Sequence, residues 1–502
     1  MIVGAFTSLS RVLGLVREML QSRLIGAGVE QSAFTLAFAI PNMSRKLFGE
    51  GALTAAFVPV FKGEVECGEV EHARRLANAV ITMVMLILGA TVTLTVCGLS
   101  AYLGWADDLS PRAELTLRLV RILFPYMIFI CGAAFGMGVL NALGRFKASS
   151  FMPALLNILW IATLAVLCFL PGLEVAARAR VVCWAILAGG AAQMAFLFVC
   201  MARRGYAPRL TFAGWRDAKV RLVWRNTATA ALGAGAVQIN YMLDQVLAQL
   251  AAPWAAGVIG YAERLMDLPL GIIGVAFGTV LLPTFAGLFA RGDADGARAA
   301  LAGSVRNQMF VMLPAAAGLC VLAPEVTRVI YEGNAFDATA TVRVSRALAV
   351  YAVGLGFFGL QKSLVPWFQA QNDMRTPLRV SVATVALNAT LNVLAIVLLP
   401  EEWRHVGLAV STVLCAAVGC VLLGALAKRR NGSLGLKGEV PALAKFALAA
   451  AVMAGALSVL KPQLAGWNRI LALGLEVVAG MAVYGVVLLA TGGLIRPRRR
   501  VA

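Results

Sequence analysis

Long apolar runs separated by short polar stretches make up most of the chain. Fourteen of these runs reach the length of about 20 residues that a helix needs to cross the hydrocarbon core of a bilayer. The pattern therefore predicts an all-α polytopic membrane protein with 14 transmembrane helices, at about residues 3–25, 32–61, 77–103, 117–143, 150–170, 180–202, 226–249, 256–289, 305–330, 340–369, 378–399, 406–427, 441–460 and 469–493.

Matching prolines indicate an internal repeat. Pro59 in AAFVPVFKG corresponds to Pro283 in TVLLPTFAG, and at the same offset Pro153 corresponds to Pro377, each opening a helix after a polar turn. We therefore expect a six-helix lobe over residues 1–205, a second six-helix lobe over 206–430, and two additional helices with a basic tail over 431–502. Because each lobe has an even number of spans, the repeats are expected to be parallel.

Composition excludes a soluble enzyme, since 60% of the residues are apolar and only 14% are charged, against about 45–50% and 25% in soluble domains. The net charge of +19 would suggest nucleic acid for a soluble protein. In a membrane protein, however, Lys and Arg gather in cytoplasmic loops, so no nucleic-acid partner is expected. The basic stretches at 203–225, 428–437 and 496–500 fall on one face, which predicts that both termini are cytoplasmic. Nine cysteines without a C-x-x-C pair and only two histidines predict neither a metal site nor a cofactor.

Three of the predicted spans each contain several ionisable residues, and each such residue costs about 2.5–3.5 kcal/mol at the bilayer centre unless it faces a partner or a watery cavity. Guanidinium groups bind phosphate and pyrophosphate through paired hydrogen bonds, which favours Arg11, Arg17, Arg45 and Arg264 as substrate-binding residues. The neighbouring carboxylates are expected to balance or gate them: Glu18, Glu50, Glu263 and Asp267. Supporting roles are expected for Pro41 and Pro269, as helix breaks beside the cavity, and for Asn42 and Lys362. Simple ion pairs between the lobes, or positions at the membrane interface, are the alternative interpretation, and we favour it for Arg23 and Lys46.

Three motifs carry a family resemblance: SRVLGLVRE (10–18), PNMSRKLFGEGALTAAFVPVF (41–61) and YAERLMDLPLGIIGVAFGTVLLP (261–283). They resemble the MurJ/MviN family of lipid II flippases, within the multidrug/oligosaccharidyl-lipid/polysaccharide exporter superfamily. The resemblance implies two lobes around a central cavity, a C-terminal helix pair that admits the lipid tail, and the same cavity arginines together with Glu50. The chain departs from the family at Ser32, where members often carry an acid; Glu30 is two residues away.

The function expected from this resemblance is transport of lipid II, the undecaprenyl-pyrophosphate-linked peptidoglycan precursor, across the bacterial inner membrane by alternating access. The chain has no G-x-x-x-x-G-K-[ST] nucleotide motif, so we expect the membrane potential to drive it. Expected partners are lipid II, membrane lipids and other cell-wall synthesis proteins. The alternatives are a flippase for another polyprenyl-linked oligosaccharide, a cation-coupled multidrug exporter, a membrane glycosyltransferase using an intramembrane acid and, least favoured, a passive scaffold.

Overall fold

The computed structural model of the chain describes residues 2–46, 53–106, 108–212, 214, 217–278 and 280–493, and within these ranges nearly every long segment is α-helical. The helices are α1 (Ile2–Ile25), α2 (Val29–Ser44), α3 (Leu53–Glu66), α4 (Val70–Trp105), α5 (Pro111–Leu123), α6 (Tyr126–Ala142), α7 (Phe146–Cys168), α8 (Val175–Ala202), α9 (Ala218–Ala251), α10 (Ala255–Gly278), α11 (Leu281–Ala290), α12 (Ala294–Tyr331), α13 (Ala338–Gln369), α14 (Arg375–Leu398), α15 (Glu401–Asn431), α16 (Val440–Gln463) and α17 (Arg469–Ala490). The predicted all-α class is confirmed.

The fourteen predicted segments account for all of these helices. Eleven segments coincide with one helix each, and the segments at 32–61, 117–143 and 256–289 each contain two: α2 with α3, α5 with α6, and α10 with α11. In the part of the chain that the structure describes, ten spans are long and apolar enough to cross a membrane. The other four predicted segments hold α1, α2–α3, α9 and α10–α11, and most of the ionisable candidates lie in these helices.

The two prolines expected to break helices lie inside helices instead. α2 continues through Pro41 to Ser44, and α10 continues through Pro269 to Gly278. A proline removes one intrahelical hydrogen bond and crowds the preceding turn, which bends a helix without having to end it. The expectation of helix breaks at these residues was therefore wrong.

The chain packs into two compact units. Unit 1 is Met1–Gly257 with Gly333–Asp337, and unit 2 is Val258–Glu332 with Ala338–Ala502. α9 packs with α2, α3 and α4 in unit 1, so the packing unit extends beyond residue 205. The lobe boundaries inferred from the repeat stay a prediction.

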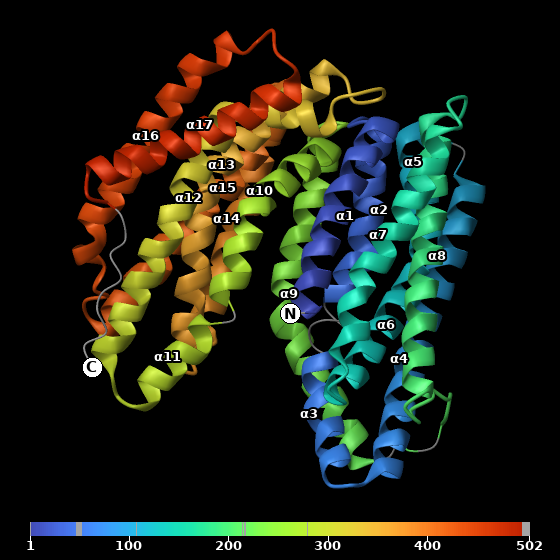
Figure 1. The fold of residues 1–502 in the computed structure, drawn as a ribbon. Helices are drawn as coiled ribbons and strands as arrows, with labels where there is room; N and C mark the ends of the chain where they lie inside the picture. The colour runs from blue at the N-terminus through green and yellow to red at the C-terminus, as the bar shows by residue number, and fades with distance from the viewer. Residues whose placement is uncertain are drawn as a thin grey trace. The chain divides into compact units, whose positions relative to one another are not determined.

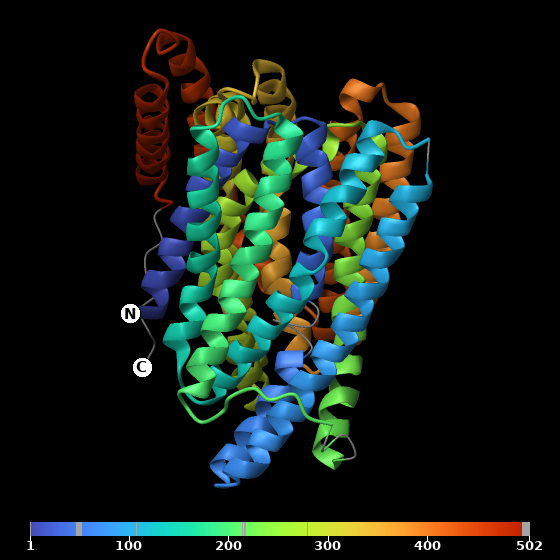
Figure 2. The same cartoon turned by 90° about the vertical axis from the view of Figure 1, so that its right-hand side faces the viewer.

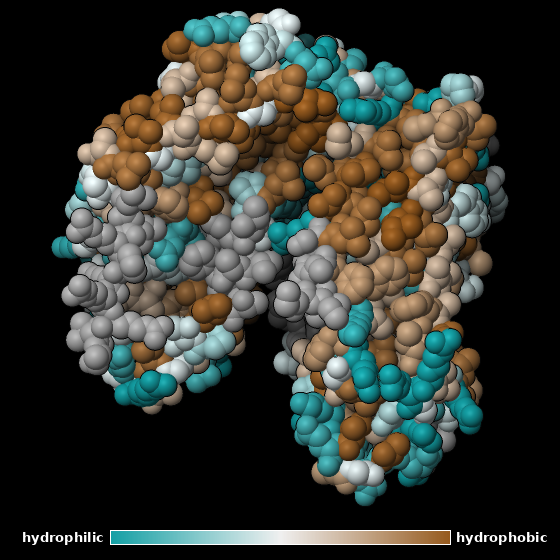
Figure 3. Space-filling model, in the orientation of Figure 1, coloured by the Kyte–Doolittle hydropathy of each residue, from teal (hydrophilic) through white to brown (hydrophobic). Residues whose placement is uncertain are grey.

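In unit 1 the long helices run side by side, as Figure 2 shows from the side of α4 and α8. α1 packs on α7, and α6 packs on α8. The core is aliphatic and aromatic, with Phe34, Phe57, Trp160 and Leu164 all less than 3% exposed. In Figure 3, hydrophobic side chains cover most of the visible flank of unit 1, while hydrophilic ones gather at the end that carries the α3–α4 turn. This banded surface is typical of a helix bundle in a bilayer.

The α1–α2 turn depends on a glycine. Gly26 has φ +78°, and a Cβ built there would lie 2.3 Å from the carbonyl oxygen of Ala335. The same short segment donates the Ala335 N–H to the carbonyl oxygen of Arg23 at 3.0 Å. A side chain at residue 26 is therefore opposed both by backbone conformation and by the packed segment 333–337.

Unit 2 is organised around α12 and α13, the most closely associated helix pair in the chain. α15 packs on α13, α14 packs on α15, and α16 and α17 pack on each other and on α12 (Figure 1). The two C-terminal helices therefore belong to the same compact unit as α12, as an addition to its helix bundle.

Candidate functional site

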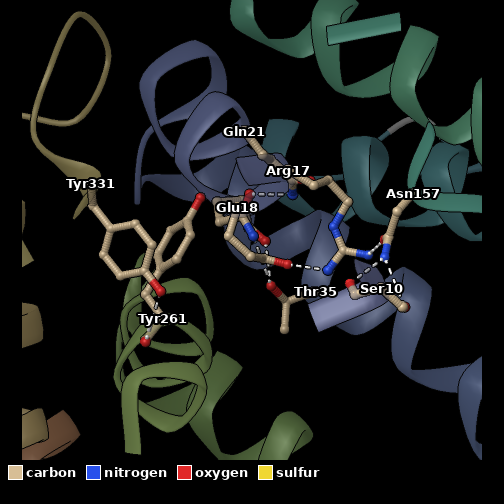
Figure 4. A network of polar contacts seen from close by, with 9 residues as sticks. Ser10, Arg17, Glu18, Gln21, Thr35, Asn157, Tyr261 and Tyr331 are labelled. Carbon is tan, nitrogen blue, oxygen red and sulfur yellow. Dashed lines mark hydrogen bonds and ion pairs between the residues drawn. The ribbon is translucent and has the colours of Figure 1, made fainter. Parts of the chain in front are cut away.

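Arg17 lies in the apolar helix α1 and has three contacts within unit 1, of which Figure 4 shows those with Asn157 and Glu18. It donates from Nη1 to Oδ1 of Asn157 at 2.9 Å, and its Nη2 pairs with Oε1 of Glu18. The guanidinium plane lies over the ring of Trp160, 4.3 Å from the ring centroid. Only 14% of the Arg17 side chain is exposed, so α1 and α7 together fix a guanidinium group inside an apolar bundle.

Asn157 connects this arginine to the neighbouring turn of α1. Its Nδ2 donates to the carbonyl oxygen of Ser10 at 3.1 Å and lies 3.4 Å from the Ser10 hydroxyl. The amide therefore accepts from Arg17 through oxygen and donates to the backbone through nitrogen, which leaves one orientation that satisfies both ends.

A second polar chain joins α1 to α2. Gln21 Nε2 donates to Oε1 of Gln31 at 3.1 Å, and Gln31 Nε2 lies 3.4 Å from the Thr35 hydroxyl. Gln21 and Gln31 are both buried. Buried amides paired across two helices fix the register of those helices, so this chain keeps the turn of α1 that carries Glu18 aligned with α2.

The end of α2 holds the second predicted arginine in this unit. Arg45 donates from Nε and Nη2 to the Asn42 side-chain oxygen, at 3.2 and 3.0 Å, so the supporting role expected for Asn42 has a geometric basis. Lys46 is exposed and lies over the ring of Tyr241 at 5.0 Å. Arg11 is on an exposed face of α1, and Glu50 lies outside the described residues.

In unit 2 the predicted residues follow one another along α10. Glu263 is half-buried and accepts from the Tyr351 hydroxyl of α13 at 3.5 Å, whereas Arg264 and Asp267 are exposed. Beside them the rings of Tyr261 and Tyr331 pack 4.7 Å apart (Figure 4). Lys362 is half-buried on α13. The structure thus gathers Arg17, Glu18 and Asn157 in unit 1, and it places Glu263, Arg264 and Asp267 on one helix of unit 2.

Ser32 is fully buried and acts as a hydrogen-bonding centre. Its hydroxyl accepts the backbone N–H of Gly257 at 3.0 Å, and its carbonyl oxygen accepts from Nε2 of Gln249 at 2.6 Å. Arg112 in turn donates from Nε to Oε1 of Gln249 at 3.2 Å. We did not predict this cluster, although Gln249 is a polar residue in a predicted span and could have been found by the same rule as the arginines.

A charged cluster closes the end of unit 1 near the α3–α4 turn. His72 lies between two carboxylates, with Nδ1 2.6 Å from Glu64 Oε2 and Nε2 3.0 Å from Asp217 Oδ2, and the Lys219 ammonium also pairs with Glu64. The hydrogen bond from Lys219 holds the pKa of Glu64 below its usual value, and the hydrogen bond from His72 does the same for the pKa of Asp217. These ion pairs attach the start of α9 to α3 and α4.

Long apolar helices in two bundles, with guanidinium and carboxylate groups held inside or along them, define a polytopic membrane transporter rather than an enzyme with a soluble catalytic domain. Solved structures share this fold. The fold matches a structure described as "Lipid II flippase MurJ, inward closed conformation" with a TM-score of 0.79 and 22% identity, over 98% of this chain and 99% of that one. It also matches an inward-facing multidrug resistance MATE family transporter of the MOP superfamily, with a TM-score of 0.69 and 16% identity, over 85% of this chain and 95% of that one. At these identities both matches describe the fold alone.

Sequence comparison identifies the family. A family model described as "Lipid II flippase MurJ" matches residues 21–473. The chain is 34% identical to a probable lipid II flippase MurJ of Rhizobium meliloti and 32% identical to that of Rhizobium tropici, in both cases over 98% of this chain and 93% of the relative. It is 30% identical to the lipid II flippase MurJ of Burkholderia cenocepacia, over 84% of this chain and 81% of that one. The chain belongs to the MurJ family of lipid II flippases, as its three motifs predicted, and it is a multi-pass membrane protein.

Proposed function

We propose that this chain moves lipid II from the inner to the outer leaflet of the bacterial inner membrane by alternating access. Family membership over nearly the whole chain supports the substrate class. On this proposal both termini lie on the cytoplasmic side, as the basic loops and tail predict.

The observation that carries the proposal is the fixed guanidinium of Arg17. An arginine inside an apolar helix is costly, and here it is oriented by Asn157 and stacked on Trp160 rather than turned outward to water. A positioned planar cation suits the pyrophosphate of a lipid-linked precursor. Arg11, Arg45 and Arg264 are proposed to contact the same group during the cycle, with Glu18, Glu50, Glu263 and Asp267 balancing their charge.

The membrane potential is the proposed driving force. Each elementary charge that crosses 100 mV gains about 2.3 kcal/mol. Two uncompensated negative charges moving out of a negative interior therefore gain about 4–5 kcal/mol per 100 mV. Flipping should consequently slow when a protonophore or ionophore collapses the potential, and unchanged flipping would remove this part of the proposal.

Depletion with complementation tests the function. Cells depleted of the protein should accumulate lipid II in the inner leaflet, and the wild-type chain should clear it. Arg17→Lys keeps the charge but loses the planar fork, and we expect it to fail; Arg23→Lys, at an exposed position of the same helix, is the matched control. If another polyprenyl-linked sugar accumulated while the amount of lipid II stayed unchanged, lipid II would be refuted as the substrate. Full rescue by Arg17→Lys, inserted at wild-type levels, would refute the role of Arg17.

A further inference from the structure

A cavity of about 420 Å³ lies inside unit 2, at the end of the bundle where α16 turns into α17. Its lining residues come from α12, α16, α17 and the turn between α16 and α17. None of its residues belongs to the arginine motifs, and its lining mixes charges of both signs: Glu325, Arg328, Lys461, Arg469 and Glu476.

One oxygen of each of two carboxylates at this cavity has no hydrogen-bond partner among the described residues. Glu476 is only 2% exposed, and its Oε2 has no hydrogen-bond partner among the described residues. Glu325 pairs through Oε1 with the Lys461 ammonium at 3.0 Å, while its buried Oε2 likewise has no partner there. Buried carboxylate oxygens without donors are costly, so these two carboxylates favour a ligand that donates hydrogen bonds and carries positive charge.

The outer part of the cavity carries cations instead. Glu332 is shared by Arg469, whose Nη1 lies 2.9 Å from Oε1, and by Arg328, whose Nε lies 3.5 Å from Oε2. Each guanidinium group has five N–H donors, and 65% of the Arg469 side chain is exposed. Most of these donors can therefore serve a bound anion.

The surroundings identify the occupant as a lipid. Trp467, in the α16–α17 turn, is 57% exposed, as is typical of a tryptophan at a membrane interface. Ile470, Val477 and Met481 are also exposed along one face of α17, next to the face that lines the cavity, and offer an apolar track for acyl chains. Arg469 and Glu476 are seven residues apart, about 10 Å along the helix. Because helical side chains lean toward the N-terminus, the carboxylate of Glu476 leans toward the end that carries Arg469.

We propose that this cavity binds the headgroup of phosphatidylethanolamine, with the primary ammonium between Glu476 and Glu325 and the phosphate on Arg469 and Arg328. A primary ammonium has three N–H donors for the two carboxylates. The quaternary ammonium of phosphatidylcholine has none, and phosphatidylglycerol has no positive charge. The site therefore discriminates among phospholipids by the amine, and it is separate from the arginines proposed for lipid II.

Native mass spectrometry of the full chain, with each lipid added in turn to delipidated protein, tests the proposal. We expect phosphatidylethanolamine to bind at least about tenfold more tightly than phosphatidylcholine or phosphatidylglycerol with the same acyl chains. In Glu476→Gln, which preserves the size of the side chain, the ratio of the affinities for phosphatidylethanolamine and phosphatidylcholine should fall close to one. Arg469→Gln should weaken the binding of phosphatidylethanolamine and phosphatidylcholine alike and leave the ratio of their affinities unchanged. Glu401→Gln, at an exposed position of α15, should change neither quantity.

Four outcomes would overturn the proposal. Equal binding of the ethanolamine and choline lipids by the wild type would show that only the phosphate is recognised. Tighter binding of phosphatidylglycerol would indicate an anionic-lipid site. A preference unchanged in Glu476→Gln, or a thermal stabilisation by Na⁺ alone that this variant abolishes, would assign the carboxylates to packing or to a metal cation.

Discussion

Replacing Arg17 with alanine tests whether the guanidinium is held by specific contacts. The hydrogen bond to Asn157, 2.9 Å long, involves a charged donor and is worth about 1.5–3 kcal/mol. The contact with the Trp160 ring adds about 0.5–2 kcal/mol. We therefore expect Arg17→Ala to cost about 3 kcal/mol, or roughly 6–10 °C in Tm for a unit of this size.

A double-mutant cycle separates this interaction from general damage to α1. Asn157→Ala also loses the contact with Ser10, so the two single variants and the double variant are compared by thermal unfolding of the purified protein in one detergent. We expect a coupling free energy of about 1.5–2 kcal/mol. Arg23→Ala, at an exposed position of the same helix, should shift Tm by about 1 °C or less. Additivity within about 0.5 kcal/mol, or an equal loss in Arg23→Ala, would refute the anchoring of Arg17 by Asn157.

Three further predictions follow from contacts in unit 1. Gly26 and Gly68 have similar positive φ angles, but only at residue 26 would an alanine Cβ lie within 4 Å of another atom. We therefore expect Gly26→Ala to lower the free energy of unfolding, measured with denaturant, by about 1–3 kcal/mol more than Gly68→Ala does. Equal losses in the two variants would contradict the close approach at residue 26. Ser32→Ala should lower stability by about 1–2 kcal/mol, because it removes the acceptor of a buried N–H; an unchanged Tm would show that this N–H finds another acceptor. Glu64→Gln and Asp217→Asn should lower Tm at pH 7, and the deficit should shrink as the pH falls below about 4: the pKa values of both carboxyls are lowered by folding, so their contribution is complete above the unfolded values of about 4 and is lost as pH falls through the lower folded values. A deficit that does not decrease at all as the pH falls below about 4 would show that the contribution is not electrostatic.

Hydropathy predicted the position of nearly every helix because a bilayer imposes one length and one surface character on each span. The breaks within spans were harder to predict. The α5–α6 break falls next to Pro125, while α2 and α10 continue through Pro41 and Pro269. A proline forbids one hydrogen bond in every case, and tertiary packing decides whether the helix bends or ends there. The position of a proline can be read from the sequence, whereas the tertiary packing around it cannot.

The partners of the candidate site were also beyond the sequence. The cost of a charge in an apolar segment identified Arg17, but its partner Asn157 lies 140 residues away. An asparagine in an apolar helix has several satisfactory environments, so its role depends on which helix packs against it. Ser32 illustrates the same limit, because a serine in a predicted span is visible in the sequence, whereas the buried N–H of Gly257 that its hydroxyl accepts is not.

Glu476 shows how the rule for intramembrane charges extends beyond recognised motifs. It is the acid within the apolar helix α17, and the cost that identified the arginines applies equally to a lone carboxylate. The family motifs drew attention to α1, α2 and α10, so an isolated acid near the C-terminus was not selected, although it is more deeply buried than Arg17. Where a buried charge has a protein partner, as Arg17 does, the interaction with that partner offsets part of the cost of burial, so the charge can serve stability as well as function. Where an oxygen of the buried group has no donor among the described residues, as in Glu476, a ligand or a proton must offset that cost, which makes such residues the more informative ones in a membrane helix.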